Sequence, residues 1–114
     1  MSCKIKYLPE FGHELKRLSK NYRSIKDDYA NLLQQLRVNP TMGTDLGSGI
    51  RKIRMSISSK GKGKSDGARV ITYNIVAKVD GNTVILVTIY DKAERSSIEK
   101  REIVALLKKN GFLS

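Results

Sequence analysis

The chain has almost none of the residues that build disulfides, zinc sites or nucleophilic triads. Its 114 residues include one cysteine, Cys3, one histidine, His13, and no tryptophan. A single cysteine excludes an internal disulfide, and one cysteine with one histidine supplies too few ligands for a zinc site made by this chain alone. Neither a Ser-His-Asp nor a Cys-His arrangement is available. We therefore expect no metal and no cofactor, and we expect His13 to be an exposed helix residue rather than a general base.

Long apolar runs are also missing. No stretch approaches the roughly 20 apolar residues that a membrane-spanning helix needs. The segment Met1–Lys6 carries charge without the apolar run of a secretory signal. With so little cysteine, these absences favour a cytoplasmic protein with no membrane partner. The length, with 39% apolar residues, is that of one globular domain spanning residues 1–114.

Acidic residues are few relative to basic ones. Lysine and arginine total 22 against 11 acids, a formal net charge of +11, which indicates a polyanionic partner such as nucleic acid, an anionic membrane or an acidic protein. Asp66 is the only acid in a stretch that holds seven cations: Arg51, Lys52, Arg54, Lys60, Lys62, Lys64 and Arg69. A membrane surface would favour a basic amphipathic helix, whereas this cluster lies in a strand and a loop. We therefore expect nucleic acid.

The first third of the chain has helical periodicity. Residues 4–8 are typical of a short strand, and Pro9 suits the first turn of a helix. From residue 11 to residue 36, apolar residues recur every three or four positions, which predicts an amphipathic stripe that packs on a sheet. Ser24, with Asp27 three residues later, favours a new N-cap. The sequence therefore predicts two helices that form a hairpin and end before Asn39-Pro40.

The remaining two thirds have mostly strand periodicity. Residues 41–49 and 58–66 are polar or glycine-rich and predict loops. Alternation at Ile53, Met55 and Ile57 predicts a strand, as does the β-branched composition of 68–79 and 83–90. Asp80-Gly81-Asn82 predicts a hairpin turn. Ser96-Ser97-Ile98-Glu99 has the pattern of a capping box for a last helix, which Gly111 is expected to end.

The predicted element order is thus β-α-α-β-β-β-α. Such an order is typical of an α+β domain in which a helical hairpin and a C-terminal helix pack on a small, mainly antiparallel sheet. We expect all the helices on one side of the sheet, which leaves the other side for function.

The basic strand and loop supply candidate RNA contacts. Lys52 and Arg54 share a strand face, and the run Lys60-Gly61-Lys62-Gly63-Lys64 places cations on a backbone that can follow a sugar-phosphate chain. Tyr73 and Tyr90 lie on neighbouring strands near this cluster. They are either stacking platforms for splayed bases or half-buried sheet residues.

One metal-free chemistry fits these residues. RNA carries its own nucleophile, the 2′-hydroxyl, so an enzyme needs only to remove its proton, stabilise a pentavalent phosphorane and protonate the leaving oxygen. Lysine and arginine suit the second task. A lysine among other cations, or Glu94, is a candidate for the proton transfers.

Three strings in the sequence resemble the RelE/ParE superfamily, especially the RelE/HigB toxins of bacterial toxin–antitoxin pairs. They are residues 49–54 (GIRKIR), residues 60–73 (KGKGKSDGARVITY) and residues 86–94 (LVTIYDKAE). The resemblance covers nearly the whole chain, and the middle string is its most specific part. It implies a RelE-like fold and a toxin that enters the ribosomal A site and cuts mRNA there, leaving a 2′,3′-cyclic phosphate.

The resemblance also implies partners and site residues. An antitoxin would neutralise the toxin, and only the complex of the two would bind operator DNA. Arg69 would contact the scissile phosphate. Lys60, Lys62 and Lys64 would occupy the basic loop, and Lys92 and Glu94 a region that supplies acid–base groups; the general acid and base stay open. Because Arg69 shares strand parity with the apolar Ile71 and Ile75, we expect it at the start of its strand or beside a bulge.

Two other functions remain open at this point. A ParE-like inhibitor of DNA gyrase has the same fold without catalysis, and fold alone does not fix function. A basic RNA- or ribosome-binding module without catalysis is the third possibility.

Overall fold

The computed structural model describes residues 3–61, 63, 66–77 and 81–114. Its elements in chain order are β1 (Cys3–Tyr7), α1 (Pro9–Asn21), α2 (Ile25–Val38), β2 (Thr44–Gly47), β3 (Ile50–Met55), the 3-10 turn η1 (Ser58–Lys60), β4 (Ala68–Ala77), β5 (Gly81–Asp91) and α3 (Lys100–Lys109). The predicted α+β class is confirmed.

The strands form one sheet in the order β1-β5-β4-β3-β2. Every neighbouring pair is antiparallel except β1 and β5, which run parallel. The sheet is therefore mainly antiparallel, as predicted. No helix in the described part of the chain is long and apolar enough to cross a membrane.

The helical hairpin covers one face of the sheet. Pro9 stands in the first turn of α1, where its missing N–H costs no hydrogen bond. Phe11 and Leu18 from α1, and Leu32 and Leu36 from α2, are buried against the inward side chains of the central strands, among them Val70, Val84 and Leu86. We call this side of the sheet the hairpin face.

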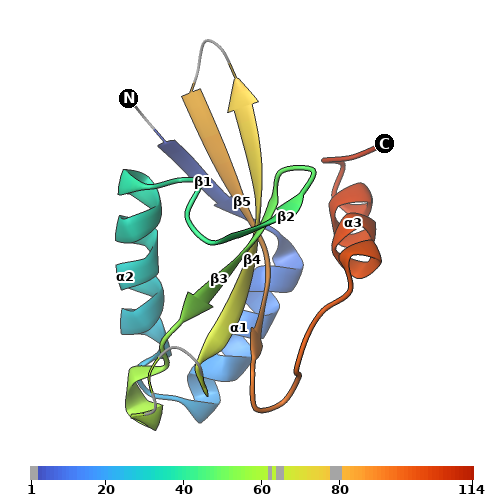
Figure 1. Ribbon diagram of the computed structural model, residues 1–114. Helices are drawn as coiled ribbons and strands as arrows, with labels where there is room; N and C mark the ends of the chain where they lie inside the picture. Colours follow the sequence, from blue (N-terminus) through green and yellow to red (C-terminus); the bar gives the residue numbers. More distant parts are fainter. Residues whose placement is uncertain (1–2, 62, 64–65, 78–80) are drawn as a thin grey trace.

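The C-terminal helix covers the opposite face, so the prediction that all helices lie on one side was wrong. Ile103 and Leu107 of α3 pack with Ile71, Ile85 and Val87. Figure 1 shows α3 standing apart from α1 and α2, across the sheet. The cause lies in the central strands, which carry apolar side chains in both directions and must be covered on both faces. We call this side the α3 face.

Two local predictions were also wrong. Within the predicted loop 41–49, residues Thr44 to Gly47 form the edge strand β2, which pairs with β3 through a turn at Ser48-Gly49 where both residues have positive φ. The Asp45 carboxylate accepts a 2.7 Å hydrogen bond from the Gly47 N–H and shapes that turn. The capping box at residues 96–99 does not form either, because Glu99 is the N-cap of α3 and makes no side-chain cap.

Strands β4 and β5 form the predicted hairpin. Their pairing runs from Ala68 opposite Asp91 at one end to Ala77 opposite Gly81 at the other. The predicted turn at Asp80-Gly81-Asn82 lies partly outside the described residues. A register shift interrupts the ladder, because Ile71 pairs with Thr88 whereas Thr72 pairs with Leu86. Val87 is thus an extra residue in β5, a β-bulge of the kind that re-aims the side chains beyond it.

Candidate nucleic-acid interface

The bulge in β5 brings an arginine and a tyrosine side by side. Ile85 and Val87 point to the α3 face, and the extra residue changes the alternation so that Tyr90 also points there. Tyr90 is the direct cross-strand partner of Arg69, and Arg69 is the partner of Arg54 on β3. The three side chains therefore form a row across three adjacent strands.

Arg69 is buried within this row. It is 5% exposed, as is expected of a position that shares its face with the core residue Ile71. Its guanidinium donates a 3.3 Å hydrogen bond to the Ala68 carbonyl oxygen. Arg69 is the second residue of β4 and lies two residues from the register shift, as strand parity led us to expect, but the side chain stays buried in this position.

A third arginine, Arg95, joins the row from the segment between β5 and α3. Its guanidinium lies 5.9 Å from the centroid of the Tyr90 ring, a cation–π distance. Both carboxylate oxygens of Glu102 on α3 accept hydrogen bonds from it, and the Ser97 carbonyl oxygen accepts a third at 2.8 Å. Sequence reasoning missed Arg95, because only the bulge and the path of this segment bring it over Tyr90. We call Arg54, Arg69, Tyr90 and Arg95 the arginine row.

The hydroxyl of Tyr90 is a hydrogen-bond donor at neutral pH. Tyr90 is 6% exposed, and burial raises the pKa of its phenol by more than the nearby guanidinium groups of Arg69 and Arg95 lower it. Burial also means that the ring presents little of its face to solvent. Tyr90 therefore keeps its hydroxyl proton at neutral pH but offers little ring surface for stacking on a splayed base.

The other predicted RNA contacts on the sheet lie on the same face. Lys52 is partly buried opposite Ile71, and Arg54 is exposed. Tyr73 is half-buried, with its ring against Gly49, and stands four residues along β4 from Arg69, roughly 13 Å at the usual rise of a strand. Lys52 thus flanks the row and Arg54 is its exposed member, whereas Tyr73 belongs to the packing under α3.

Lys60 holds the basic loop to the end of β5. Its ammonium group lies 2.6 Å from the Asp91 carboxylate, and both side chains are largely buried, at 12% and 1% exposure. Tyr22, which follows the last residue of α1, donates a 2.6 Å hydrogen bond to the same carboxylate, and the Lys60 ammonium also donates to the Asp66 carbonyl oxygen. Burial opposes ionisation of Asp91, but hydrogen bonds from Lys60 and Tyr22 outweigh it and lower its pKa. Lys60 is therefore an anchor of the loop.

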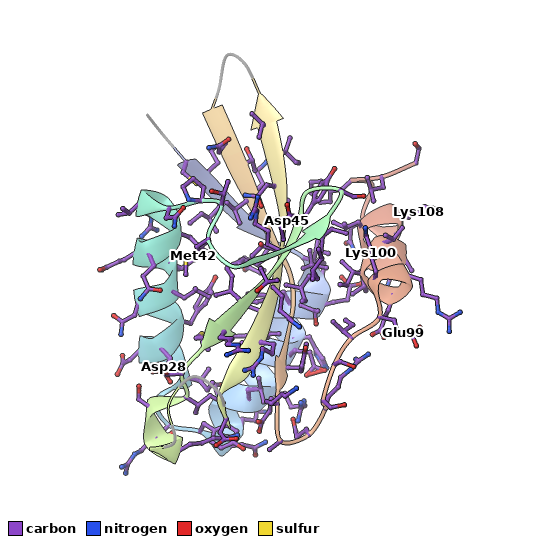
Figure 2. All side chains as sticks on the ribbon, in the orientation of Figure 1. Asp28, Met42, Asp45, Glu99, Lys100 and Lys108 are labelled. Atoms are coloured by element: carbon purple, nitrogen blue, oxygen red, sulfur yellow. The ribbon has the colours of Figure 1, made fainter. Side chains whose placement is uncertain are left out.

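The start of the loop is fixed to α2. Asp28 accepts hydrogen bonds from the backbone N–H and the hydroxyl of Ser58, and Figure 2 labels it beside η1. Ser24, at the predicted N-cap position, donates its hydroxyl to Asp28 and accepts a 2.9 Å bond from the Ser59 N–H. Ser24 thus binds η1 instead of capping its own helix. Lys62 and Lys64, between these anchors, lie outside the described residues.

Lys92 and Glu94 do not join the row. The Lys92 ammonium donates to the Ser96 carbonyl oxygen. The Glu94 carboxylate accepts two hydrogen bonds, at 2.8 and 3.2 Å, from Arg17 of α1, so it lies toward the hairpin face. The pKa of Glu94 is lowered mainly by the hydrogen bond from Arg17, which keeps the carboxylate ionised and makes it a weak base.

Within the described part of the chain, no three residues of the types His, Cys, Asp and Glu gather as a metal site would require. The cationic and hydroxyl groups of this surface are of the kind that bind anions, although Arg95 is already paired with Glu102. Three guanidinium groups and one phenol converge on one end of the α3 face, and guanidinium groups match the geometry of phosphate oxygens.

A protein-family comparison gives a match over most of the chain. The model described as the RelE toxin of the RelE/RelB toxin–antitoxin system matches residues 13–112. The matched span includes every strand from β2 to β5, the basic loop and the whole arginine row.

Proposed function

The chain belongs to the RelE toxin family of toxin–antitoxin systems, and we propose that it is a metal-independent endoribonuclease that cuts mRNA on the ribosome. Family membership implies a cognate antitoxin as its partner. The proposal adds the ribosomal A site and mRNA as targets, the cytoplasm as the place of action, and operator DNA as a ligand only of the toxin–antitoxin complex.

The arginine row is the observation that carries this proposal. Cleavage by the 2′-hydroxyl passes through a phosphorane whose extra negative charge must be stabilised before it forms, and prearranged donors are the most effective way to do so. Arg69 is held in place by burial, and Arg95 by Glu102. Both guanidinium groups are therefore oriented without a substrate, and the Tyr90 hydroxyl adds a neutral donor beside them.

The remaining roles follow from the surroundings of the row. We assign the scissile phosphate to Arg69, and transition-state contacts to Lys62 and Lys64 of the basic loop. Lys52, beside the row, and Arg54, its exposed member, would bind neighbouring phosphates, since both lie on the α3 face. Lys60 supports them by anchoring the loop through Asp91. Lys92 and Glu94 stay candidates for proton transfer, although Glu94 would first have to leave Arg17.

Mapping mRNA ends in cells tests the proposal. After brief expression of the wild-type chain, we expect new 5′ ends inside translated codons. The variant Arg54→Ala, which truncates an exposed side chain, should reduce their number, whereas Arg37→Ala on the exposed side of α2 should not. Growth arrest with intact mRNA and blocked DNA supercoiling would instead identify a gyrase inhibitor. Ribosome binding without cuts would identify a module that lacks catalysis.

A further inference from the structure

A groove of about 500 Å³ lies away from the arginine row, where α1 and α2 meet beside the end of β1. The hairpin face of the sheet carries these helices, and the row is on the α3 face. The groove is thus separated from the proposed chemistry by the sheet itself, and none of the residues assigned to RNA lines it.

The floor of the groove is aromatic. Phe11 is fully buried, and its ring centroid lies 5.7 Å from that of Tyr29 and 6.4 Å from that of Tyr7. Tyr7 is 62% exposed, although it is a large apolar side chain next to a core residue. Gly12 permits this arrangement, because a Cβ at that position would lie 3.1 Å from the Tyr7 ring. An exposed ring on a buried aromatic floor is a surface that a partner's apolar side chains can cover.

The rim of the groove is cationic. Lys16 and Lys20 of α1, one helical turn apart, and Lys26 of α2 line it, and no acidic residue does. All three lysines are exposed, and none has an ion pair with a carboxylate in the described part of the chain. Their neighbour Arg17, by contrast, is paired with both Glu14 and Glu94. The rim therefore holds unneutralised charge around an apolar floor.

We propose that this groove is the docking site for an acidic amphipathic helix of the cognate antitoxin. A helix laid along two helices offers apolar side chains at every third or fourth position to the aromatic floor. Carboxylates beside that stripe would meet Lys16, Lys20 and Lys26, which gives the contact both orientation and specificity. The inference rests on membership of the toxin family, and it does not depend on the ribonuclease chemistry.

The position of the groove has a mechanistic consequence. A segment bound there leaves the arginine row uncovered, because the sheet lies between them. Under the proposed action on ribosomes, which the docking site itself does not require, neutralisation through this contact would act by adding bulk that keeps the toxin out of the ribosome. Removal of the contact should therefore weaken neutralisation without changing the toxin's own activity.

Charge reversal at the rim tests the docking site. The probe is the full-length antitoxin, identified as the protein whose co-expression with the wild-type chain restores growth. We expect Lys16→Glu with Lys20→Glu and Lys26→Glu to raise its Kd at least about tenfold while growth arrest by the free toxin is retained. The matched control carries Lys100→Glu, Arg101→Glu and Lys108→Glu on the exposed side of α3, and its Kd should stay at the wild-type value.

A second variant tests the floor. Tyr7→Ala removes a largely exposed ring at little cost to folding, and we expect it to raise the Kd several-fold at high salt, where the rim is screened. An unchanged Kd in both groove variants, or an equal loss in the α3 control, would overturn the proposal. So would a groove variant that binds the antitoxin normally but no longer cuts mRNA, since the groove would then be an RNA site. A neutralisable toxin that cuts no mRNA would refute the proposed function and leave the docking site intact.

Discussion

The side chain of Arg69 is buried between Arg54 and Tyr90, its partners on the two neighbouring strands. A buried guanidinium is fixed in direction, and fixed donors contribute most where negative charge develops. Arg69→Ala should therefore lower the rate of mRNA cleavage on ribosomes on the order of 100-fold or more. Arg69→Lys should recover only part of that loss, because an ammonium group cannot bind two phosphate oxygens in the same plane.

Single-turnover cleavage of a defined mRNA measures this effect, with thermal unfolding as the check that each variant folds. Arg37→Ala, on the exposed side of α2, is the control for loss of one positive charge. Cleavage at the wild-type rate by folded Arg69→Ala would remove Arg69 from the site.

The pair Lys60–Asp91 should stabilise the protein across a defined range of pH. Asp91→Asn keeps the shape of the side chain but leaves Lys60 without its counter-charge, at an expected cost of about 3 kcal/mol in the free energy of unfolding. The pKa of Asp91 is lowered, so its contribution is present above the ordinary carboxyl range and is lost as pH falls through the folded value. The pKa of Lys60 is raised, since Asp91 outweighs burial, so its contribution is lost as pH rises through the folded value.

The difference between wild type and Asp91→Asn should therefore be constant from about pH 5 to about pH 10 and shrink outside that window. Urea unfolding at pH 3, 7 and 11 measures it. Glu99→Gln, which breaks the exposed pair with Arg101, should change stability little at any of these values. Equal effects of the two substitutions at pH 7 would contradict a buried, structural role for the Lys60–Asp91 pair.

At the scale of elements, α3 covers a second hydrophobic core on its face of the sheet, so its buried side chains should contribute to the stability of the domain. Leu107 is fully buried between α3 and the sheet, so Leu107→Ala should lower the free energy of unfolding by about 2–4 kcal/mol. Val38→Ala, at an 87% exposed position of α2, should have no measurable effect. Denaturant unfolding of both variants decides the matter. A loss below about 1 kcal/mol for Leu107→Ala would mean that α3 is not a structural part of the domain.

The sequence predicted most elements, and the exceptions have physical causes. Periodicity located the helices and the β4–β5 hairpin, because burial of one face selects those spacings. It failed for β2, because the glycines in and around this strand are typical of loops but here allow turns with positive φ. Periodicity also did not predict that α3 packs on the opposite face from the helical hairpin, since an apolar strand does not indicate which helix covers each of its faces. The run from Ile85 to Ile89 gave no sign of its bulge.

The candidate site was predictable only in part for the same reason. Lys52 and Arg54 were found from charge and spacing and Arg69 from the family resemblance, and the three do share a face. Arg95 was missed because its place over Tyr90 depends on the bulge in β5 and on Glu102 of α3. Lys60 was found as a cation, but its partner Asp91 is distant in sequence, so its anchoring role could not be inferred.

At the scale of the whole molecule, the excess charge should make RNA binding depend steeply on salt. Each phosphate contact to a single strand contributes roughly 0.7 to the log–log salt slope. Lys52→Gln with Arg54→Gln should therefore reduce the slope by about 1.4. Fluorescence anisotropy with a labelled single-stranded RNA measures it. Arg101→Gln with Lys108→Gln on α3 removes the same charge and should leave the slope almost unchanged. Equal reductions in the salt slope would mean that RNA binding depends on net charge and not on the basic side chains of strand β3.

The two proposed sites lie on opposite sides of one sheet. The arginine row, proposed to bind a phosphate, is on the α3 face, and the groove proposed for the antitoxin is on the outer side of the helical hairpin. Because the sheet keeps them apart, activity and neutralisation should be separable by substitution.

Cleavage of an mRNA with one altered nucleotide tests the central claim most directly. The cut is first mapped in an all-ribose mRNA bound to purified ribosomes, and the same mRNA is then made with a 2′-deoxy nucleotide on the 5′ side of that cut. If the 2′-hydroxyl is the nucleophile and the arginine row stabilises the phosphorane, the all-ribose mRNA yields a 2′,3′-cyclic phosphate and the deoxy mRNA stays intact at that position. Cleavage of the deoxy mRNA at the same bond would contradict the account.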